Sequence, residues 1–399
     1  MTRSGPTQAD RPTGPPASTA PGTTPVVEVE DLTVRVRRGS AMLTLVEGLS
    51  YRVAPARAMA IVGESGAGKS IGIRAVLGLL DPRRFEVTGT VRFDGVDVAQ
   101  LPRAKRRHFV SGVASLVFQD PTRSLNPTMR VGPQIAEAML AGSGRPDQAS
   151  GEAPLGRAEA RRRSVELIRD VGIAAPDERY FAYPHELSGG MRQRIVIAIA
   201  LACRPKVIFC DEPTSSLDVT TQAAIMDLLD GLREAHSISN IVVTHDLALA
   251  ASRAEQVLVM YGGQVVEALP ARGIARTSRM PYTQALIRAV PDVGLPGRPP
   301  RPIEGSPPDP RDPPPGCAFA ARCEHAEDDC GQDRPALVEV TDRHLVRCWH
   351  PRSTPPQPST SAQPSTSAQP STSPQSLTSS QSSTSSQSSS TTPVAEVAP

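Results

Sequence analysis

One eight-residue segment combines glycines, a lysine and a serine at a spacing that suits a bound phosphate. Residues 63–70 read Gly-Glu-Ser-Gly-Ala-Gly-Lys-Ser, which fits the pattern G-x-x-x-x-G-K-[ST]. The glycines allow backbone N–H groups to converge on phosphate oxygens, and the dipole of a following helix adds to the attraction. Lys69 would pair with the β- and γ-phosphates of a nucleotide, and Ser70 would bind Mg²⁺. The candidate nucleotide-binding residues of this loop are Gly63, Glu64, Ser65, Gly66, Ala67, Gly68, Lys69 and Ser70.

Lysine is rare in this chain, which makes the lysine of the loop informative. The 399 residues include 43 lysines and arginines, of which only Lys69, Lys105 and Lys206 are lysines. A compact ammonium fits between phosphates inside a tight loop, whereas the planar fork of a guanidinium does not. A glycine-rich turn that binds no nucleotide is the alternative. We disfavour it because the segment lies between a predicted strand and a predicted helix.

Two adjacent carboxylates could supply the second half of a magnesium–nucleotide site. Residues 207–212 read Val-Ile-Phe-Cys-Asp-Glu, so Asp211 and Glu212 lie at the end of an apolar, strand-like run. We expect Asp211 to hold Mg²⁺ through water and Glu212 to polarise the attacking water. Two carboxylates that merely leave a strand for solvent are the alternative, which is weak beside a phosphate loop.

The elements that must position these residues form an alternating α/β pattern. Residues 58–62 (AMAIV) predict a buried strand, and a helix is predicted over residues 69–80 that stops at Asp81-Pro82. The β-branched runs at 207–211 and 241–244 are typical of parallel central strands. Together these segments predict an α/β core built on a parallel sheet.

Four further segments resemble motifs of the ATP-binding-cassette (ABC) proteins, and their order and spacing match across residues 26–270. They correspond to the signature motif, the Q-loop, the D-loop and the switch histidine of that family. The four read Leu-Ser-Gly-Gly-Met-Arg-Gln-Arg (187–194), Val-Phe-Gln-Asp (117–120), Ser-Ser-Leu-Asp (215–218) and Thr-His-Asp (244–246). The resemblance implies an α/β P-loop NTPase fold with an antiparallel β subdomain, a RecA-like parallel-sheet core, a helical subdomain and a small Cys-rich C-terminal module.

The same resemblance implies roles for single residues. ATP is the implied nucleotide, with Mg²⁺ held by Ser70, Gln119 and Asp211. Catalysis is implied for Glu212, for Gln119 and for His245, which would hydrogen-bond the γ-phosphate. The signature turn opens a helix, so its N–H groups form an anion site that would contact the γ-phosphate bound by a second subunit. The further nucleotide-binding residues implied are Ser188, Gly189, Gly190 and Asp218.

The chain departs from the family where the base is expected to bind. The family usually offers an aromatic side chain that stacks on adenine, but the matching stretch, residues 32–36, holds Val36, and Tyr51 belongs to the next strand. Because base stacking is worth about 1–3 kcal/mol where it occurs, we expect weaker ATP binding or looser base selectivity. The usual Gly-Glu turn before the phosphate strand reads Ala56-Arg57.

Further motifs resemble the ATPases of dipeptide, oligopeptide and nickel importers. Met191 in the signature is similar to the first of the two paralogous ATPases of such systems, whereas Met280 stands where histidine is typical. The resemblance implies an ATPase that powers peptide import. Nickel, a metallophore or another small solute as cargo, or an ABC ATPase without a transport role, are the alternatives. The motifs are Phe-Gln-Asp-Pro (118–121), Ser-Leu-Asn-Pro (124–127), Tyr-Pro-His-Glu (183–186) and Pro-Tyr-Thr-Gln-Ala-Leu (281–286).

Such a system implies several partners. They are two transmembrane permease subunits, a second ABC ATPase subunit (a paralogue or another copy of this chain) and an extracytoplasmic substrate-binding protein. The formal net charge of +2 argues against a nucleic-acid partner. The longest apolar run, residues 195–203, is less than half of the roughly 20 residues that cross a bilayer, and no signal peptide is evident. We therefore expect a peripheral protein on the cytoplasmic face of the membrane.

Four of the six cysteines lie close together in the sequence, at Cys317, Cys323, Cys330 and Cys348. Their spacing resembles the four-cysteine module of this importer family, which binds a [4Fe–4S] cluster in some members. Four thiolates suit either an Fe–S cluster or tetrahedral Zn²⁺, and the absence of paired C-x₂-C knuckles favours the cluster. Metal-free thiols are a third option. We interpret His325, His344 and His350 as neighbours of the site, and Cys203 and Cys210 as buried apolar residues.

These patterns divide the chain into four parts. Residues 1–25 are predicted to be disordered, and residues 26–275 to form the ABC ATPase domain, with its helical subdomain at about 127–186. After a proline-rich stretch, residues 295–315, the four-cysteine site completes a C-terminal extension of the oligopeptide-transporter type, residues 276–350. Residues 351–399 form a Ser/Thr/Gln/Pro-rich tail that is predicted to be disordered.

Overall fold

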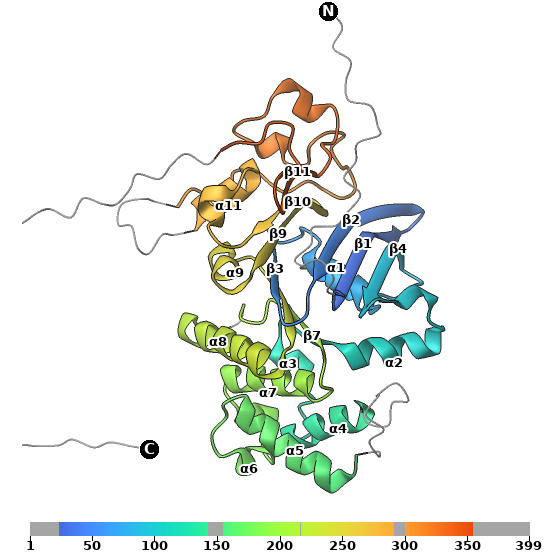
Figure 1. The fold of residues 1–399 in the computed structure, drawn as a ribbon, viewed down its shortest axis with the longest axis vertical. Helices are drawn as coiled ribbons and strands as arrows, with labels where there is room; N and C mark the ends of the chain where they lie inside the picture. Colours follow the sequence, from blue (N-terminus) through green and yellow to red (C-terminus); the bar gives the residue numbers. More distant parts are fainter. Residues whose placement is uncertain (1–23, 143–154, 216, 291–299, 354–399) are drawn as a thin grey trace, which may run out of the picture. The chain divides into compact units, whose positions relative to one another are not determined.

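Two β-sheets and a set of helices make up the protein (Figure 1). The computed structural model describes residues 24–142, 155–215, 217–290 and 300–353. Most of the predicted disordered N-terminus and of the Ser/Thr/Gln/Pro-rich tail lies outside the described residues, and so does Ser216 of the predicted D-loop. The predicted α/β class, with an antiparallel subdomain and a parallel-sheet core, is confirmed.

The core is a mixed sheet of eight strands. Five neighbouring strands run parallel in the order β6-β7-β8-β3-β9, and three antiparallel strands, β10, β12 and β11, continue the sheet beyond β9. β3, β7 and β8 are buried along their whole length, as expected for mostly apolar strands covered on both faces. The first six strands span Ala58–Val62 (β3), Ala114–Val117 (β6), Val207–Asp211 (β7), Ser239–Thr244 (β8), Gln256–Tyr261 (β9) and Gln264–Pro270 (β10).

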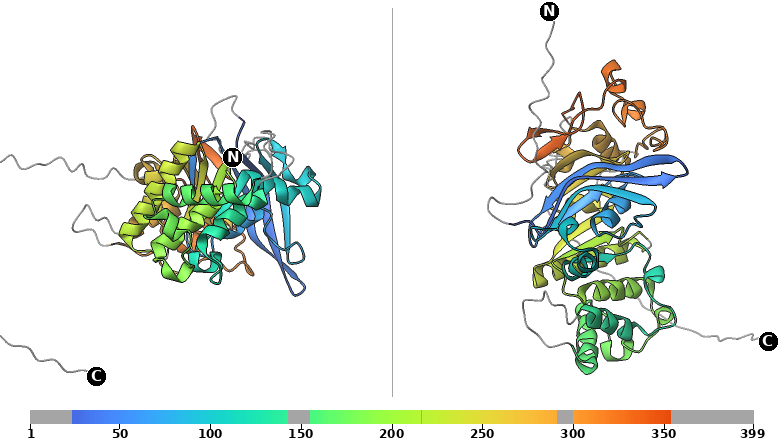
Figure 2. Two further views of the ribbon diagram at one scale, coloured as in Figure 1. Left: turned by 90° about the horizontal axis from the view of Figure 1, so that it is seen from below. Right: turned by 90° about the vertical axis from the view of Figure 1, so that its right-hand side faces the viewer.

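A second, antiparallel sheet has the strand order β2-β1-β4-β5. Buried and more exposed residues alternate along β1, so one face of this sheet packs with helix α1 (Lys69–Val76) in a shared apolar core. The right-hand view of Figure 2 shows these long blue strands crossing the molecule. The strands span Val27–Arg38 (β1), Ala41–Val53 (β2), Phe85–Phe93 (β4) and Val96–Asp97 (β5).

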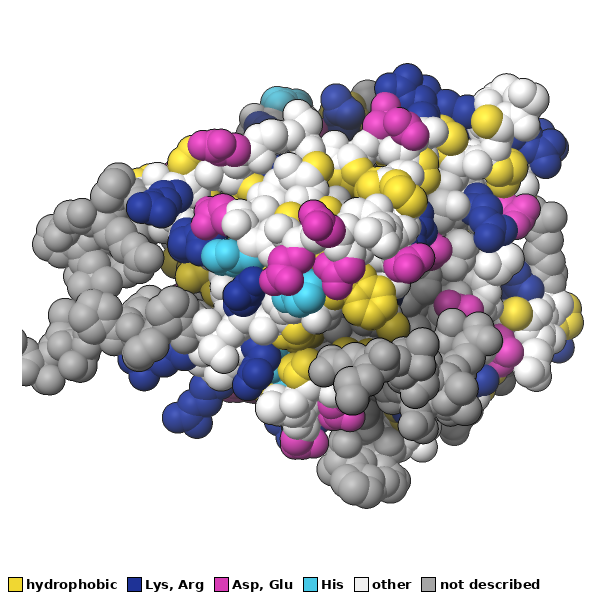
Figure 3. All heavy atoms as spheres, turned by 90° about the horizontal axis from the view of Figure 1, so that it is seen from above, with side chains coloured by type: hydrophobic (Ala, Val, Ile, Leu, Met, Phe, Trp, Pro, Cys, Tyr) yellow, Lys and Arg dark blue, Asp and Glu magenta, His cyan; other side chains and the backbone are white. Residues whose placement is uncertain are grey.

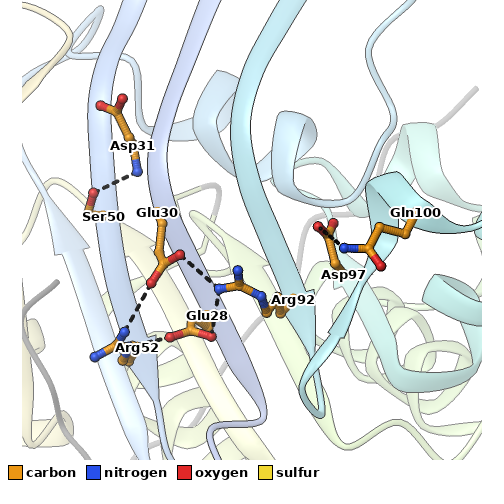
Figure 4. A network of polar contacts seen from close by, with 8 residues as sticks. All are labelled: Glu28, Glu30, Asp31, Ser50, Arg52, Arg92, Asp97 and Gln100. Carbon is orange, nitrogen blue, oxygen red and sulfur yellow. Dashed lines mark hydrogen bonds and ion pairs between the residues drawn. The ribbon is translucent and has the colours of Figure 1, made fainter. Parts of the chain in front are cut away.

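The other face of this sheet carries a ladder of opposite charges (Figure 4). Glu28 and Glu30 of β1 lie between Arg52 of β2 and Arg92 of β4, and each carboxylate pairs with both guanidinium groups. The hydrogen bond from Arg92 is the main cause that lowers the pKa of Glu30. Glu28 lies directly opposite Arg52 and Arg92 on the neighbouring strands, and Glu30 reaches both arginines diagonally, so these pairs favour one register among the three strands.

A group of helices forms a second apolar core at one end of the core sheet, drawn in green in Figure 1. α4 (Val131–Gly142) and α5 (Arg157–Asp170) pack together and against α7 (Gly189–Leu201), and α6 (Pro176–Arg179) packs against α5. The remaining helices span Arg103–Val113 (α2), Pro121–Ser124 (α3), Val219–His236 (α8), Leu247–Arg253 (α9), Ile274–Thr277 (α10) and Pro281–Ala289 (α11), with 3₁₀ turns at Val98–Gln100, Pro184–Glu186, Ala320–Arg322 and Asp328–Gly331.

Helix α1 ends at Val76, four residues before the predicted end at residue 80. Gly78 adopts a left-handed conformation, with φ of 67°. The N–H groups of Gly78 and Leu79 turn back to the carbonyls of Ala75 and Arg74, which is the Schellman arrangement of a helix C-terminus. The prediction relied on Asp81-Pro82 as the stop and missed the glycine that ends the helix first.

The C-terminal extension joins the core sheet. β12 (His344–Val346) pairs with β10, and β11 (Val338–Thr341) pairs with β12 at the sheet edge. A buried hydrogen bond of 2.7 Å between His344 Nε2 and Glu267 Oε1 also links β12 to β10. Two strands from beyond residue 276 are thus part of the sheet that carries the phosphate loop. Among the described residues, no helix has the length and apolar character needed to cross a membrane.

Candidate nucleotide-binding site

The predicted phosphate loop connects β3 to α1, and two of its glycines are required by close backbone contacts. A Cβ atom at Gly63 would lie 2.2 Å from the carbonyl oxygen of Met260. A Cβ atom at Gly68 would lie 2.8 Å from the carbonyl oxygen of Leu45. Gly68 also has φ of 94°, in the left-handed region that favours glycine. A larger side chain at Gly63 or Gly68 would therefore clash with the backbone of a neighbouring segment.

Lys69 is the first residue of α1 and is only 5% exposed. Its ammonium donates hydrogen bonds to the carbonyls of Gly63 at 2.6 Å and Glu64 at 2.9 Å, so the side chain folds back along the loop. Burial lowers the pKa of Lys69, and the carboxylates of Glu212, Asp211 and Glu64 oppose this shift. The loop thus presents a buried ammonium, held by its own carbonyls, to the space that it borders.

Ser70 and Asp211 form a pair of oxygen donors at the start of α1. The Ser70 hydroxyl donates to Asp211 Oδ1 at 2.6 Å, although the two residues are 141 positions apart in the chain. Asp211 ends β7 and is almost completely buried, and Arg74 lies 3.8 Å from its second oxygen. A hydroxyl next to a carboxylate is a donor set that suits Mg²⁺. The residues present therefore fit the metal that the motif implies.

The other two predicted catalytic residues, Gln119 and His245, lie beside the carboxylate of Glu212. Its backbone leaves the end of β7 in a left-handed conformation, with φ of 47°. Gln119 Nε2 donates to Glu212 Oε2 at 3.2 Å, and His245 Nδ1 lies 3.6 Å from the same oxygen. The His245 side chain is 64% exposed. An amide, a carboxylate and an imidazole thus meet from three separate segments at the carboxyl ends of β6, β7 and β8.

A cavity of about 1020 Å³ brings these residues together. Its inner wall is the phosphate loop with Gln119, Glu212 and His245. Other lining residues include 42–45 at the start of β2 and 307–311, 313 and 314 from the proline-rich stretch. Residues far apart in the sequence therefore enclose one site, and part of its wall belongs to the C-terminal extension.

The structure clarifies the missing aromatic side chain. Val36 is buried in the sheet and does not line the cavity, and Tyr51 is completely buried in β2. The described residues therefore offer no stacking ring at either position. The apolar residues that line the cavity include Met42, Leu43, Tyr261 and Pro308. Weaker ATP binding or looser base selectivity stays a prediction.

The signature and D-loop residues lie outside this cavity but next to each other. Ser188 is the N-cap of α7, and its hydroxyl accepts a hydrogen bond from the N–H of Met191. A Cβ atom at Gly190 would lie 2.8 Å from a methyl group of Thr221, at the start of α8. Asp218 is the N-cap of α8 and accepts hydrogen bonds from the N–H and hydroxyl of Thr221, which lower its pKa. Ser188 and Gly189 are exposed, so this helix N-terminus is open to a partner.

The four C-terminal cysteines lie near one another in the extension. Cys317 and Cys330 share a backbone hydrogen bond of 2.8 Å, and the N–H of His325 donates to the Cys323 sulfur. Burial raises the pKa of Cys348 to about 11, with a smaller contribution from the other three thiols. In the described residues, no three of these sulfurs lie within 4.8 Å of one another.

A different trio does meet that distance. Asp329, Cys330 and His350 bring their potential ligand atoms within 4.8 Å, and His350 Nε2 lies 2.9 Å from Asp329 Oδ1. The face of the molecule seen from above also shows histidine side chains beside acidic ones (Figure 3). The prediction that His350 is only a neighbour of the cysteine site stays a prediction.

The sequence missed two residues that contact the phosphate loop. The Tyr282 hydroxyl accepts a hydrogen bond from the N–H of Glu64 at 2.9 Å, and Arg322 pairs with the Glu64 carboxylate. The sequence identifies Tyr282 only as part of a family motif and predicts no contact for it. No local pattern distinguishes Arg322 from the other arginines. Both belong to the C-terminal extension.

Comparison with known proteins agrees with this geometry. The family model described as "ABC transporter" matches residues 46–215, and the model described as "Oligopeptide/dipeptide transporter, C-terminal region" matches residues 266–330. Among solved structures, the ATP-binding cassette MJ0796, a dimer in a post-hydrolysis state bound to ADP and Pi, is 26% identical. Its TM-score is 0.52, covering 62% of this chain and 99% of that one. CbiO1 from Clostridium perfringens, part of the ABC transporter complex cbiONQ, is 25% identical with a TM-score of 0.52, covering 63% and 90%.

Curated relatives extend over most of the chain. The oligopeptide transport ATP-binding protein OppD of Mycobacterium tuberculosis is 43% identical over 325 residues, which is 81% of this chain. The match spans 52% of OppD, so this chain covers about half the length of that relative. The dipeptide transport ATP-binding protein DppD of Escherichia coli is 39% identical over 326 residues, covering 82% of this chain and 97% of DppD. The chain therefore belongs to the OppD/DppD family of ABC transporter ATP-binding proteins.

Proposed function

We propose that this protein binds and hydrolyses ATP to power an importer of dipeptides or oligopeptides. The observation that carries the proposal is the convergence of Lys69, Ser70 and Glu212 on one cavity, with Asp211 hydrogen-bonded to Ser70. The OppD/DppD relatives and the oligopeptide-type C-terminal region support the peptide cargo.

The described contacts support a division of labour within the cavity. The loop amides and the Lys69 ammonium would bind the triphosphate oxygens, as in other P-loop enzymes. Ser70 and Asp211 would hold Mg²⁺, which neutralises charge between the β- and γ-phosphates. Glu212 would accept a hydrogen bond from the attacking water, while Gln119 and His245, which lie beside its carboxylate, would orient that water and the γ-phosphate.

The second half of the site would come from a partner cassette. Ser188 and Gly189 are exposed at the N-terminus of α7, a 13-residue helix whose N–H groups could bind an anion. They do not border the cavity of their own chain, so they would close the ATP site of another subunit, either a paralogue or a second copy. Two permease subunits and an extracytoplasmic substrate-binding protein complete the proposed importer, with this chain at the cytoplasmic face of the membrane.

Cargo is tested in a strain that lacks this protein. We expect the deletion to abolish growth on dipeptides or oligopeptides as the sole source of a required amino acid, and the wild-type copy to restore it. Free amino acid serves as the control. Nickel or another small solute becomes the cargo if peptide uptake is normal while uptake of that solute is lost. A purified protein without MgATPase activity, alone or with its transporter, would contradict the enzymatic part of the proposal.

We also propose that the four cysteines bind a [4Fe–4S] cluster. A tetrahedral zinc site with Zn–S bonds of about 2.3 Å requires sulfurs about 3.8 Å apart, and no three of these sulfurs lie within 4.8 Å. A four-iron cluster binds each thiolate to a different iron, which suits a wider set. Burial raises the pKa of Cys317, Cys323 and Cys348, and backbone N–H groups directed at their sulfurs partly oppose this shift.

Metal analysis distinguishes the three options. Protein purified without oxygen should be brown and contain about four iron atoms per chain. Cys330→Ser should lower the iron content, whereas Cys203→Ser, outside the extension, should leave it unchanged. A colourless anaerobic preparation with one zinc per chain would replace the cluster by zinc, and a preparation with neither metal would leave free thiols.

A further inference from the structure

Arg322 lies at the meeting point of the cysteine module and the phosphate loop. It ends the 3₁₀ turn Ala320–Arg322 and directly precedes Cys323. Its side chain is only 5% exposed. Two guanidinium nitrogens donate to the two carboxylate oxygens of Glu64 at 2.7 and 3.1 Å, across 258 positions of sequence. This bidentate pair is the strongest kind of contact an arginine makes with a carboxylate.

The guanidinium is held in place by further contacts. Its Nε donates to the carbonyl of Glu304 at 2.8 Å, and Nη2 donates to that of Ile303 at 3.2 Å. Nη1 also donates to the hydroxyl of Tyr261 at 3.1 Å. The hydrogen bonds to Glu64 are the main cause that raises the pKa of Arg322. A side chain fixed by so many partners positions whatever it binds.

The backbone of Glu64 makes a second contact with the extension. Its N–H donates to the hydroxyl of Tyr282, a residue of α11. Tyr282 packs against Tyr261 and Phe319, with ring centroids 4.5 and 5.2 Å away, and all three rings are buried. The carbonyl of Glu64 in turn accepts a hydrogen bond from Lys69 at 2.9 Å. The extension therefore contacts Glu64, one of the two loop residues whose carbonyls bind Lys69.

The charge of Glu64 explains why the loop needs this partner. Glu64 borders the cavity that is proposed to receive a triphosphate, and its side chain is 23% exposed. An unpaired carboxylate there would repel the phosphates and would add its charge where solvent screens little. Arg322 neutralises that charge and keeps the carboxylate turned toward the extension.

We propose that Arg322 is a positioning residue of the nucleotide site, through which the C-terminal cysteine module sets the conformation and charge of the phosphate loop. The inference rests on the proposed ATP binding. It assigns to the extension a direct effect on affinity for MgATP, without contact between Arg322 and the nucleotide. Because coupling between two sites is reciprocal, MgATP should also stabilise the segment around Arg322.

The test measures MgATP binding by calorimetry and the steady-state KM and kcat of the full-length protein. We expect Arg322→Gln to weaken MgATP binding and raise KM about tenfold, within the usual range for coupled sites, with a much smaller change in kcat. Adding Glu64→Gln to that variant should restore most of the affinity, because the unpaired carboxylate is removed. Arg288→Gln is the matched control, since Arg288 of α11 pairs with the exposed Glu324 at 3.1 Å. This variant should bind MgATP as the wild type does.

Hydrogen–deuterium exchange supplies a readout independent of turnover. MgATP should slow exchange at residues 317–323 in the wild type and in Arg288→Gln but not in Arg322→Gln. An unchanged KM in folded Arg322→Gln, or no recovery in the double variant, overturns the inference while leaving the ATPase assignment intact. If Arg322→Gln does not fold, Tyr282→Phe decides, because it removes only the hydroxyl that binds Glu64: a raised KM supports the inference and an unchanged one overturns it. A wild type that does not bind MgATP contradicts the proposed function instead.

Discussion

Glu212→Gln should slow ATP hydrolysis by about 10²–10⁴-fold, the usual contribution of a positioned general base. That loss corresponds to about 3–5 kcal/mol of activation free energy. The substitution keeps the size of the side chain and the partner at Gln119, but it removes the negative charge that would draw a proton from water. MgATP binding should persist, because Glu212 lies at the end of β7 and does not belong to the phosphate loop.

The measurement is phosphate release under saturating MgATP, with binding followed separately by calorimetry. Glu234→Gln is the matched control, because Glu234 lies on α8 with its side chain 72% exposed and pairs with Arg233 at 3.4 Å. Wild-type turnover in a pure preparation of Glu212→Gln would remove Glu212 from the mechanism. A loss of binding together with turnover would instead point to a damaged site.

The sequence predicts the inner half of the site because of a topological rule. Glu212 and His245 each follow a predicted strand, and the carboxyl ends of parallel strands meet at one edge of a sheet. The strand before Gln119, β6, was not predicted, and Gln119 was identified only through the resemblance to the Q-loop. A strand, a glycine loop and a helix in succession likewise dictate where Lys69 lies. The contact between Ser70 and Asp211, which are 141 positions apart, agrees with this rule, because each residue follows the carboxyl end of a predicted strand or lies at it.

The outer half of the site could not be predicted in this way. Arg322 lies in a short 3₁₀ turn and meets Glu64 across 258 positions, in an extension whose strand β12 pairs with β10 of the core sheet. Pro308 and Arg311 reach the cavity from a stretch that reads as a linker. Edge strands of three or four residues, such as β11 and β12, have too weak a local pattern for their pairing with the core sheet to be predicted. The early end of α1 at Val76 has a local cause in Gly78, which a reading centred on proline overlooked.

Lys69→Ala should weaken MgATP binding by about 10²–10³-fold, which corresponds to the loss of about 3–4 kcal/mol from one preorganised charged donor. Two effects add in this variant. The phosphates lose a buried ammonium, and the carbonyls of Gly63 and Glu64 lose the hydrogen bonds that fold the loop. Turnover should fall with binding, because the β- and γ-phosphates are no longer held in line with the attacking water.

Lys206→Ala is the matched control, because the Lys206 ammonium lies on the surface, with its side chain 63% exposed, and pairs only with Asp94 among the described acidic groups. The scarcity of lysine permits a second, direct measurement. An amine-reactive reagent can modify only Lys69, Lys105, Lys206 and the N-terminus, and mass spectrometry should show that MgATP protects Lys69 alone. Equal modification of Lys69 with and without MgATP, together with wild-type affinity in folded Lys69→Ala, would place the triphosphate somewhere other than this loop. At a nucleotide concentration near the wild-type Kd, loss of this protection in Arg322→Gln would show in the same experiment that Arg322 of the extension affects MgATP binding at the phosphate loop.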